Sequence, residues 1–338
     1  MCLVVFSRFV WSPNLESDAP DGKKIQKKWP HVKPAKWHRA SLRLAVGAPL
    51  GQFGRVNNAS LADAALVVLG HGTELNDQSA VPVRQHAGEL RRRKLFRAVQ
   101  EAYWKQEPQI KKVLAGIDAP RVFIAPLFIS EGYFSDQIIP EALGFDRSRL
   151  IRQATGITFF CKPVGTHESM TKVILSRAAD ITKKFPFPRA PKPAETTLFI
   201  AGHGTERNPN SRKAIEHQAD IIRSQKIYAD VHAVYMEEDP RITGCTALAQ
   251  TKHCVVVPLF ISDGLHVVED IPVLLGEPGR IVKSRLAAGQ PTWRNPTEKH
   301  GKLVWYSSSV GTDPGVADVI LERVHEAAKA DLIGGGGA

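Results

Sequence analysis

The chain has 338 residues, of which 43% are hydrophobic and 23% are charged, and its formal net charge is +11. This length suits two domains of ordinary size, and the composition is that of a globular protein rather than a fibrous or disordered one. No stretch approaches the ~20 consecutive apolar residues that a membrane-spanning helix needs, which excludes a membrane protein of that type.

Residues 1–60 form a basic leader, with ten Lys or Arg residues against three acidic ones. Its apolar start, "MCLVVFSRFVW", follows no basic segment and precedes no clear cleavage site, so we expect no signal peptide. The lysines alternate with Trp29 and Trp37, a pattern compatible with binding to nucleic acid or another polyanion. We favour the simpler interpretation of a poorly ordered, solvated extension without a nucleic-acid partner.

The four cysteines (Cys2, Cys161, Cys245 and Cys254) are scattered and form no CxxC motif. This spacing disfavours a zinc or iron–sulfur site and predicts reduced thiols in a cytoplasmic protein.

Two long phrases occur twice in the chain at one spacing. "LVVLGHGTELN" at 66–76 returns as "LFIAGHGTERN" at 198–208. "PLFISEGYFSDQIIPEALG" from Pro126 returns as "PLFISDGLHVVEDIPVLLG" from Pro258, so each pair lies 132 residues apart. Two separate phrases at one offset indicate a duplicated unit with the same elements in the same order.

Each copy of the unit alternates short apolar strands with helices. In the second copy we predict strands at 197–201, 230–236, 253–260 and 302–307, and helices at about 211–224, from Pro240, through "VVEDIPVLL" and from about Pro314. This alternation is typical of a parallel sheet covered by helices on both faces. The second copy also contains an insertion at about 277–300.

We therefore expect an α/β protein of two similar Rossmann-like or flavodoxin-like domains. The predicted segments are the leader at 1–60, a first domain at 61–183, a Pro-rich linker at 184–194, a second domain at 195–330 and a Gly-rich tail at 331–338.

Three polar side chains follow three strands of the second domain. His203 follows the first strand between two glycines, Glu237 follows the second strand, and His266 follows the third strand. Ligands of parallel α/β sheets bind beyond the carboxyl ends of the strands, so these groups should converge on one edge. Two imidazoles and a carboxylate suit a divalent first-row metal ion and can also accept protons.

The first domain lacks this set. At the same offset Lys105 replaces Glu237 and Phe134 replaces His266, so only His71 is retained. An ammonium group and a phenyl ring cannot bind a divalent metal ion. We therefore predict that the second domain carries the chemistry and that His71 serves as a hydrogen-bonding residue or as a wall of the binding cleft.

The "GHGT" phrase, the acidic residue after the second strand and "PLFISDGLHVVEDIP" resemble the class II chelatases over about residues 62–330. These include the sirohydrochlorin cobaltochelatases and ferrochelatases and, more distantly, the anaerobic cobalt chelatases and protoporphyrin ferrochelatases. The resemblance implies two α/β domains facing across a cleft, and insertion of a divalent metal into a tetrapyrrole without ATP. It assigns metal binding and proton transfer to His203, Glu237 and His266.

The sequence leaves open the metal ion, the exact tetrapyrrole and the choice between an enzyme and a carrier. Co²⁺ is the first expectation for the metal substrate, with Fe²⁺ or Ni²⁺ behind it, and no organic cofactor is expected. The substrate would be sirohydrochlorin or a related polycarboxylate tetrapyrrole. A tetrapyrrole or metal carrier without turnover is the alternative function. A duplicated chain can supply both walls of a cleft, which favours a monomer.

The sequence allows two interpretations for each residue that could support the site or line its rim. Asp270, four residues after His266, is placed either to orient that imidazole or to lie on the helix surface. Arg280, Arg285 and Arg294 of the insertion are candidates to hold substrate carboxylates, with solvated surface as the alternative for each.

Overall fold

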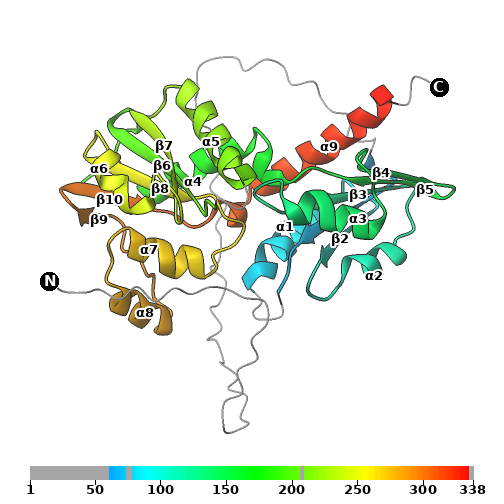
Figure 1. Ribbon diagram of the computed structural model, residues 1–338, viewed down its shortest axis with the longest axis horizontal. Helices are drawn as coiled ribbons and strands as arrows, with labels where there is room; N and C mark the ends of the chain where they lie inside the picture. Colours follow the sequence, from blue (N-terminus) through cyan, green and yellow to red (C-terminus); the bar gives the residue numbers. More distant parts are fainter. Residues whose placement is uncertain (1–60, 74–77, 206–208, 335–338) are drawn as a thin grey trace, which may run out of the picture. The chain divides into compact units, whose positions relative to one another are not determined.

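The computed structural model describes residues 61–73, 78–205 and 209–334 (Figure 1). The predicted leader at 1–60 and residues 335–338 of the predicted tail lie outside the described residues. The last helix runs to Gly334, so part of the segment predicted as a tail is helical.

The first sheet has five strands in the order β2-β1-β3-β5-β4. Its parallel strands are β1 (Ala64–Gly70), β2 (Ala98–Tyr103), β3 (Arg121–Pro126) and β5 (Gly156–Phe160), and β4 (Leu150–Gln153) runs antiparallel at the edge. Every residue of β1 is buried, as expected for a strand covered on both faces.

The second sheet repeats this topology in the order β7-β6-β8-β10-β9. Its strands are β6 (Thr196–Gly202), β7 (Asp230–Tyr235), β8 (His253–Pro258), β10 (Lys302–Tyr306) and the antiparallel β9 (Thr297–Lys299). The four parallel strands predicted from the sequence are confirmed. Each sheet has in addition one antiparallel edge strand, β4 or β9, which was not predicted because it is too short and too polar to be recognised before its pairing is known.

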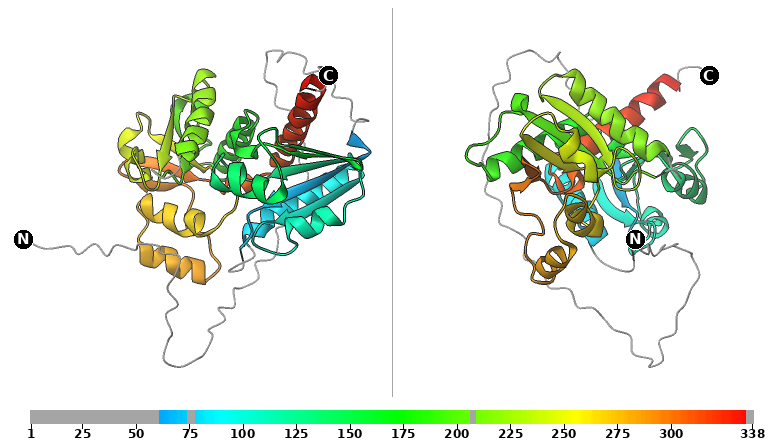
Figure 2. Two further views of the ribbon diagram at one scale, coloured as in Figure 1. Left: turned by 45° about the vertical axis from the view of Figure 1, so that its right-hand side comes forward. Right: turned by 60° about the vertical axis from the view of Figure 1, so that its left-hand side comes forward.

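Helices connect the strands. The first half has α1 (Val81–Arg93), α2 (Ile110–Ala115), α3 (Ile139–Leu143) and α4 (Met170–Lys184). The second half has α5 (Pro209–Ser224), α6 (Cys245–Leu248), α7 (Ile271–Leu274), α8 (Gly279–Ala287) and α9 (Val316–Gly334). Helix α8 belongs to the insertion and lies alongside α7 (Figures 1 and 2).

The two halves exchange their closing helices. Helix α4 ends the first half but contacts β8, β10 and α5 of the second, whereas α9 ends the second half but contacts β3, β5 and α1 of the first (Figure 1). One hydrophobic core therefore includes residues of both halves, such as Leu66, Leu198, Ile174 and Ile320. The outer face of each sheet packs a separate core of its own half.

Matched hydrogen bonds join the two halves. The His86 Nε2–H donates to Gly311 O over 2.7 Å, and Gln218, which lies 132 residues after His86, donates to Gly165 O over 3.3 Å. Gly165 and Gly311 occupy the same place in two Val-Gly-Thr turns, and a Cβ on either would lie about 2 Å from a backbone oxygen of the loop that follows β3 or β8, that of Ile129 or Ile261. The contact between the halves thus has approximate twofold symmetry.

The exchanged helices contribute buried arginines to this contact. Arg323 of α9 is 4% exposed and donates to Pro163 O over 2.9 Å and to Thr166 Oγ1 over 2.6 Å. Arg177 of α4 donates in the same way to Thr312 Oγ1 over 2.8 Å. Each arginine satisfies acceptors of the opposite half, which ties the two sheets together.

We expect the His86 contact to make stability depend on pH. Burial, followed by the charges of Arg177 and Arg93, holds the pKa of His86 below its ordinary value, although Gly311 O and Glu89 oppose this shift. The unfolded chain takes up this proton near pH ~6.5, whereas the folded chain resists it. Stability contributed by neutral His86 is thus complete above pH ~6.5 and is lost as pH falls toward the lower folded pKa.

The variant His86→Gln, which copies the residue found at Gln218, should reduce the fall in thermal midpoint between pH 7 and pH 5. Thermal melts across this range measure the effect. An unchanged difference between the two midpoints would show that protonation of His86 is not coupled to folding.

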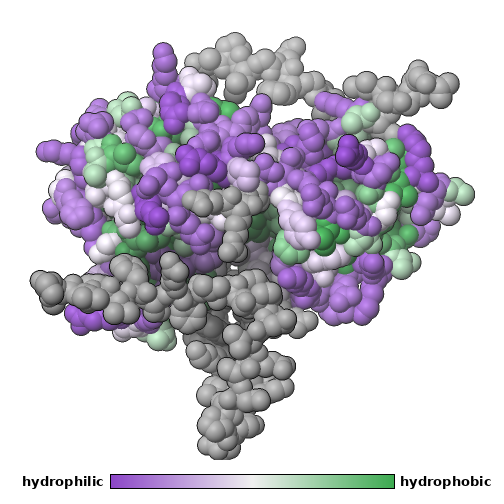
Figure 3. Space-filling model, in the orientation of Figure 1, coloured by the Kyte–Doolittle hydropathy of each residue, from purple (hydrophilic) through white to green (hydrophobic). Residues whose placement is uncertain are grey.

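Among the described residues, no helix is long and apolar enough to cross a bilayer. On the face shown in Figure 3, hydrophilic side chains predominate and the hydrophobic ones form small separate patches.

Candidate metal centre

His203, Glu237 and His266 lie at one edge of the second sheet. His203 directly follows β6, Glu237 lies two residues after β7, and His266 begins the π-helical turn η7 (His266–Asp270) beyond β8. Strands β7, β6 and β8 are adjacent and parallel, so their carboxyl ends meet at this edge. The structure thus brings together the three predicted side chains.

The two imidazoles contact each other directly. Their ring centroids are 5.1 Å apart with an interplanar angle of 82°, and the His203 Nδ1 atom lies 3.8 Å from Glu237 Oε2. This last distance is too long for a hydrogen bond, so Glu237 remains available to other partners. Its side chain is 57% exposed, which gives it access to solvent.

Hydrogen bonds orient both imidazoles. His203 Nδ1 lies 3.2 Å from Gly204 O, and His266 Nδ1 lies 2.7 Å from Asp270 Oδ2. A carbonyl and a carboxylate only accept, so Nδ1 carries the hydrogen in each neutral ring. The Nε2 lone pairs are left to bind a metal ion or accept a proton, and Asp270 has the orienting position considered from the sequence.

Glycine 204 shapes the turn after β6. Its φ of +61° is in the left-handed region, and a Cβ there would lie 2.6 Å from the Cβ of Tyr235. Only glycine fits this backbone without strain, which explains why the histidine is followed by glycine.

Within the described part of the chain, no group of three His, Cys, Asp or Glu side chains is placed so that it could hold a metal ion. The imidazoles and carboxylate described above therefore form an open arrangement. Side-chain exposures of 36% for His203 and 51% for His266 agree with that.

The first half keeps the geometry of this edge with different chemistry. His71 and Phe134 have ring centroids 4.8 Å apart at 81°, close to the values of the two histidines, and His71 Nδ1 donates to Gly72 O over 3.0 Å. Lys105, the counterpart of Glu237, places its Nζ atom 5.3 Å from the Phe134 ring centroid. Burial, together with the Lys105 charge, lowers the pKa of His71, although the hydrogen bond to Gly72 O opposes this shift.

The candidate rim arginines differ in their surroundings. Arg285 forms an ion pair of 2.9 Å with buried Glu277 and donates to Thr292 O over 3.0 Å, so it stabilises the insertion and is not free to hold substrate. Arg280 and Arg294 are exposed. Helix α8 contacts η7, and Lys283 lies 3.8 Å from Glu269 of that turn.

Two exposed apolar side chains, one at this edge and one at the matching edge of the first half, were not predicted from the sequence. Leu265 is 54% exposed beside His266, and Tyr133 is 63% exposed beside Phe134. The repeat offset could have identified them, because Leu265 and Tyr133 lie 132 residues apart and both are apolar. Exposed positions usually carry polar side chains.

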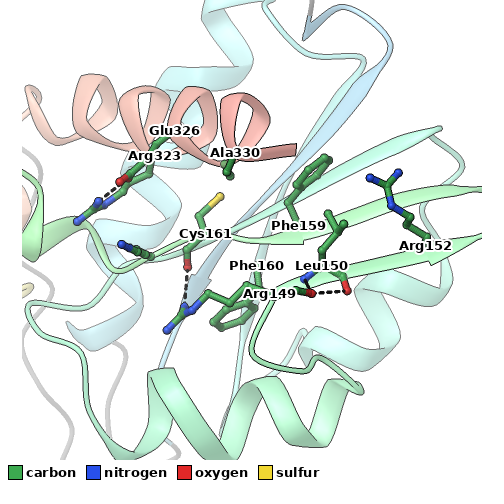
Figure 4. Close-up of a pocket in the computed structure, with 12 residues that line it drawn as sticks. Arg149, Leu150, Arg152, Phe159, Phe160, Cys161, Arg323, Glu326 and Ala330 are labelled. Atoms are coloured by element: carbon green, nitrogen blue, oxygen red, sulfur yellow. Dashed lines mark hydrogen bonds and ion pairs between the residues drawn. The ribbon is translucent and has the colours of Figure 1, made fainter. Parts of the chain in front are cut away.

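Two cavities among the described residues lie away from this edge. A cavity of about 470 Å³ lies between α9 and strands β4 and β5, with Arg149, Phe159, Cys161 and Arg323 among its lining residues (Figure 4). Burial raises the pKa of the Cys161 thiol to about 12, so this thiol is not a nucleophile. A second cavity of about 270 Å³ is lined by residues of α5 and β7.

We expect Asp270→Asn to lower the rate of any reaction that uses His266 by about 10- to 100-fold. An amide has a donor NH2 group as well as an acceptor oxygen, so it no longer holds the imidazole in the Nδ1–H tautomer alone. Steady-state rates of Asp270→Asn and of the exposed control Glu298→Gln measure this. Equal rates for the two variants would mean that Asp270 is only a surface residue.

Comparisons with known proteins identify relatives of this chain. The CbiX family matches residues 65–181 and again 197–327. A probable sirohydrochlorin cobaltochelatase of Halobacterium salinarum is 40% identical over 279 residues, which cover 78% of this chain and 91% of that protein.

Solved structures share the fold. A multi-domain protein of Deinococcus radiodurans, described as structurally similar to chelatases, has a TM-score of 0.62 at 24% identity, covering 80% of this chain. The present chain spans about half of that protein, 55% of its length. SirB from Bacillus subtilis, solved with Fe³⁺, has a TM-score of 0.57 at 18% identity and covers 80% of this chain and 98% of its own.

Proposed function

This chain belongs to the CbiX family, and on that premise we propose that it is an enzyme that inserts a divalent metal ion into sirohydrochlorin. The observation that carries the proposal is the contact between His203 and His266. The Nδ1 atom of each ring is hydrogen-bonded to an acceptor, so the Nε2 atom of each neutral ring carries no proton. The counterpart pair in the first half, His71 and Phe134, has one imidazole only. We therefore assign the reaction to the second domain, at 195–330, and regard the first, at 61–183, as its degenerate partner.

The reaction explains these residue types. Insertion of M²⁺ displaces two pyrrole N–H protons, so two protons must leave for each metal ion that enters. Neutral imidazoles, with an ordinary pKa of ~6.5, accept such protons near neutral pH. We assign metal receipt and proton acceptance to His203 and His266, and we assign to Glu237 the capture of the ion and the transfer of protons to solvent.

Co²⁺ is the metal we propose first, since the Halobacterium relative is named a cobaltochelatase, with Fe²⁺ and Ni²⁺ as alternatives. Imidazole and carboxylate ligands accept all three ions, so the donor set does not choose among them. We further propose that the macrocycle enters a cleft between the two halves, that the chain acts as a monomer, and that it works in the cytoplasm without an organic cofactor.

An anaerobic assay tests the function. Purified protein, metal-free sirohydrochlorin and Co²⁺, Fe²⁺ or Ni²⁺ are mixed, and the change in macrocycle absorption is followed against the uncatalysed rate. We expect acceleration with at least one ion. The alternative, a carrier that binds the macrocycle without turnover, predicts stoichiometric binding and no acceleration with any of them.

A further inference from the structure

The first half preserves the backbone frame of the metal centre. The Lys105 N–H donates to His71 O over 2.8 Å, as the Glu237 N–H donates to His203 O over 3.2 Å. The aromatic pairs have nearly the same separation and angle, as described above. Lys105 therefore occupies the place of Glu237 in space and not only in the alignment of the repeats.

The charge of this frame is reversed. Lys105 is exposed, and its ammonium group lies 5.3 Å from the centroid of the Phe134 ring, within the range of a cation–π contact. In the segments 61–73, 78–205 and 209–334, no carboxylate forms an ion pair with Lys105. A cation in this position repels divalent metal ions and attracts anions.

Phe134, which lies against this cation, and its neighbour Tyr133 are both exposed aromatic residues. Tyr133 is 63% exposed and Phe134 is 36% exposed, and their ring centroids lie 5.8 Å apart. Solvent-exposed aromatic rings offer flat apolar contacts, and the Tyr133 hydroxyl adds a hydrogen-bond donor. A cation against one exposed ring, with a second exposed ring next to the first, matches a carboxylate that is attached to a flat conjugated ring system.

We propose that Lys105, Tyr133 and Phe134, here called the Lys105 site, bind a peripheral carboxylate of the macrocyclic substrate. The ammonium group pairs with the carboxylate, and the rings of Tyr133 and Phe134 contact the adjoining edge of the macrocycle. This assignment rests on the proposed function. It gives the degenerate half a role, because the first half holds the substrate while the second half handles the metal ion and the protons.

Equilibrium binding of metal-free sirohydrochlorin, measured anaerobically by quenching of its fluorescence, tests the Lys105 site. We expect Lys105→Met to weaken binding about tenfold, Lys105→Glu to weaken it further, and Lys105→Arg to stay close to wild type. Lys111→Met is the matched control, because Lys111 is exposed on α2 of the same half. It should change the Kd less than twofold.

Two further measurements identify the source of the carboxylate. A methyl-esterified macrocycle should bind Lys105→Met and wild type equally, since it has no carboxylate to lose. Acetate should compete with sirohydrochlorin only weakly; strong competition that Lys105→Met removes would assign the site to free small anions and overturn the proposal. In turnover, Lys105→Met should raise KM and leave kcat near wild type.

The outcomes separate this inference from the proposed function. Wild-type protein that accelerates metal insertion, together with a Lys105→Met variant that binds like Lys111→Met, would overturn the Lys105 site alone. Wild-type protein that neither binds nor metallates sirohydrochlorin would overturn both. Thermal midpoints of all variants should match wild type, because these lysines are exposed.

Discussion

His203→Ala is expected to slow metal insertion about a thousandfold, within the range of about 10²–10⁴ that a positioned proton acceptor contributes. The substitution removes the Nε2 lone pair of an imidazole that contacts His266, and with it one of the two groups to which we assign proton or metal receipt. The side chain is 36% exposed, so its loss should leave the thermal midpoint close to wild type. Initial rates from the absorption change of sirohydrochlorin, at saturating Co²⁺, measure the effect.

His71→Ala is the matched control, since His71 has the same turn, the same hydrogen bond to the following glycine and an aromatic partner at a similar distance. We expect it to retain most of the rate. An inactive His71→Ala beside an active His203→Ala would place the reaction in the first half and contradict our assignment.

Arg323→Met should lower the free energy of unfolding by about 3 kcal/mol, because it removes a buried charge that satisfies acceptors across the contact between the halves. Pro163 O and Thr166 Oγ1 lose a donor in a place from which water is largely excluded. Chemical denaturation followed by tryptophan fluorescence measures the loss. A single transition is expected, since α9 packs on the sheet of the opposite half.

Arg92→Met provides the comparison. Arg92 also forms an ion pair with a carboxylate, Glu89, but its side chain is 72% exposed, so its loss should cost less than about 0.5 kcal/mol. If the two variants unfold at the same denaturant concentration, the contact through Arg323 does not hold the halves together.

The regular elements could be predicted because their signals are local. Runs such as "TLFIA" and "CVVVPLF" are rich in apolar and β-branched residues, and a glycine or a proline stands where each strand ends, so their conformation can be predicted from a few residues. Strands β4 and β9 could not be predicted in this way, because they are short and amphipathic and are stabilised by antiparallel pairing with β5 and β10.

Part of the candidate site could likewise be predicted from the sequence, and part could not. The repeat offset, together with the rule for parallel sheets, predicted that His203, Glu237 and His266 share an edge, and the structure places them there. The structural role of Arg285 could not be predicted, because its partners Glu277 and Thr292 approach it only when the insertion folds. No spacing in the sequence distinguishes such an arginine from one that is free to bind substrate.

The sequence by itself determined the duplication, the strand and helix order and the half that carries both imidazoles, since these depend on residue type and on a constant spacing. Only the tertiary structure decided that α4 and α9 exchange between the halves, and that Lys105 lies against Phe134 in the place of Glu237. The amphipathic pattern of α4 or α9 is the same whichever sheet the helix covers, because both sheets present similar apolar faces. The choice between them is made by contacts distant in sequence, such as Arg323 with Thr166 and His86 with Gly311.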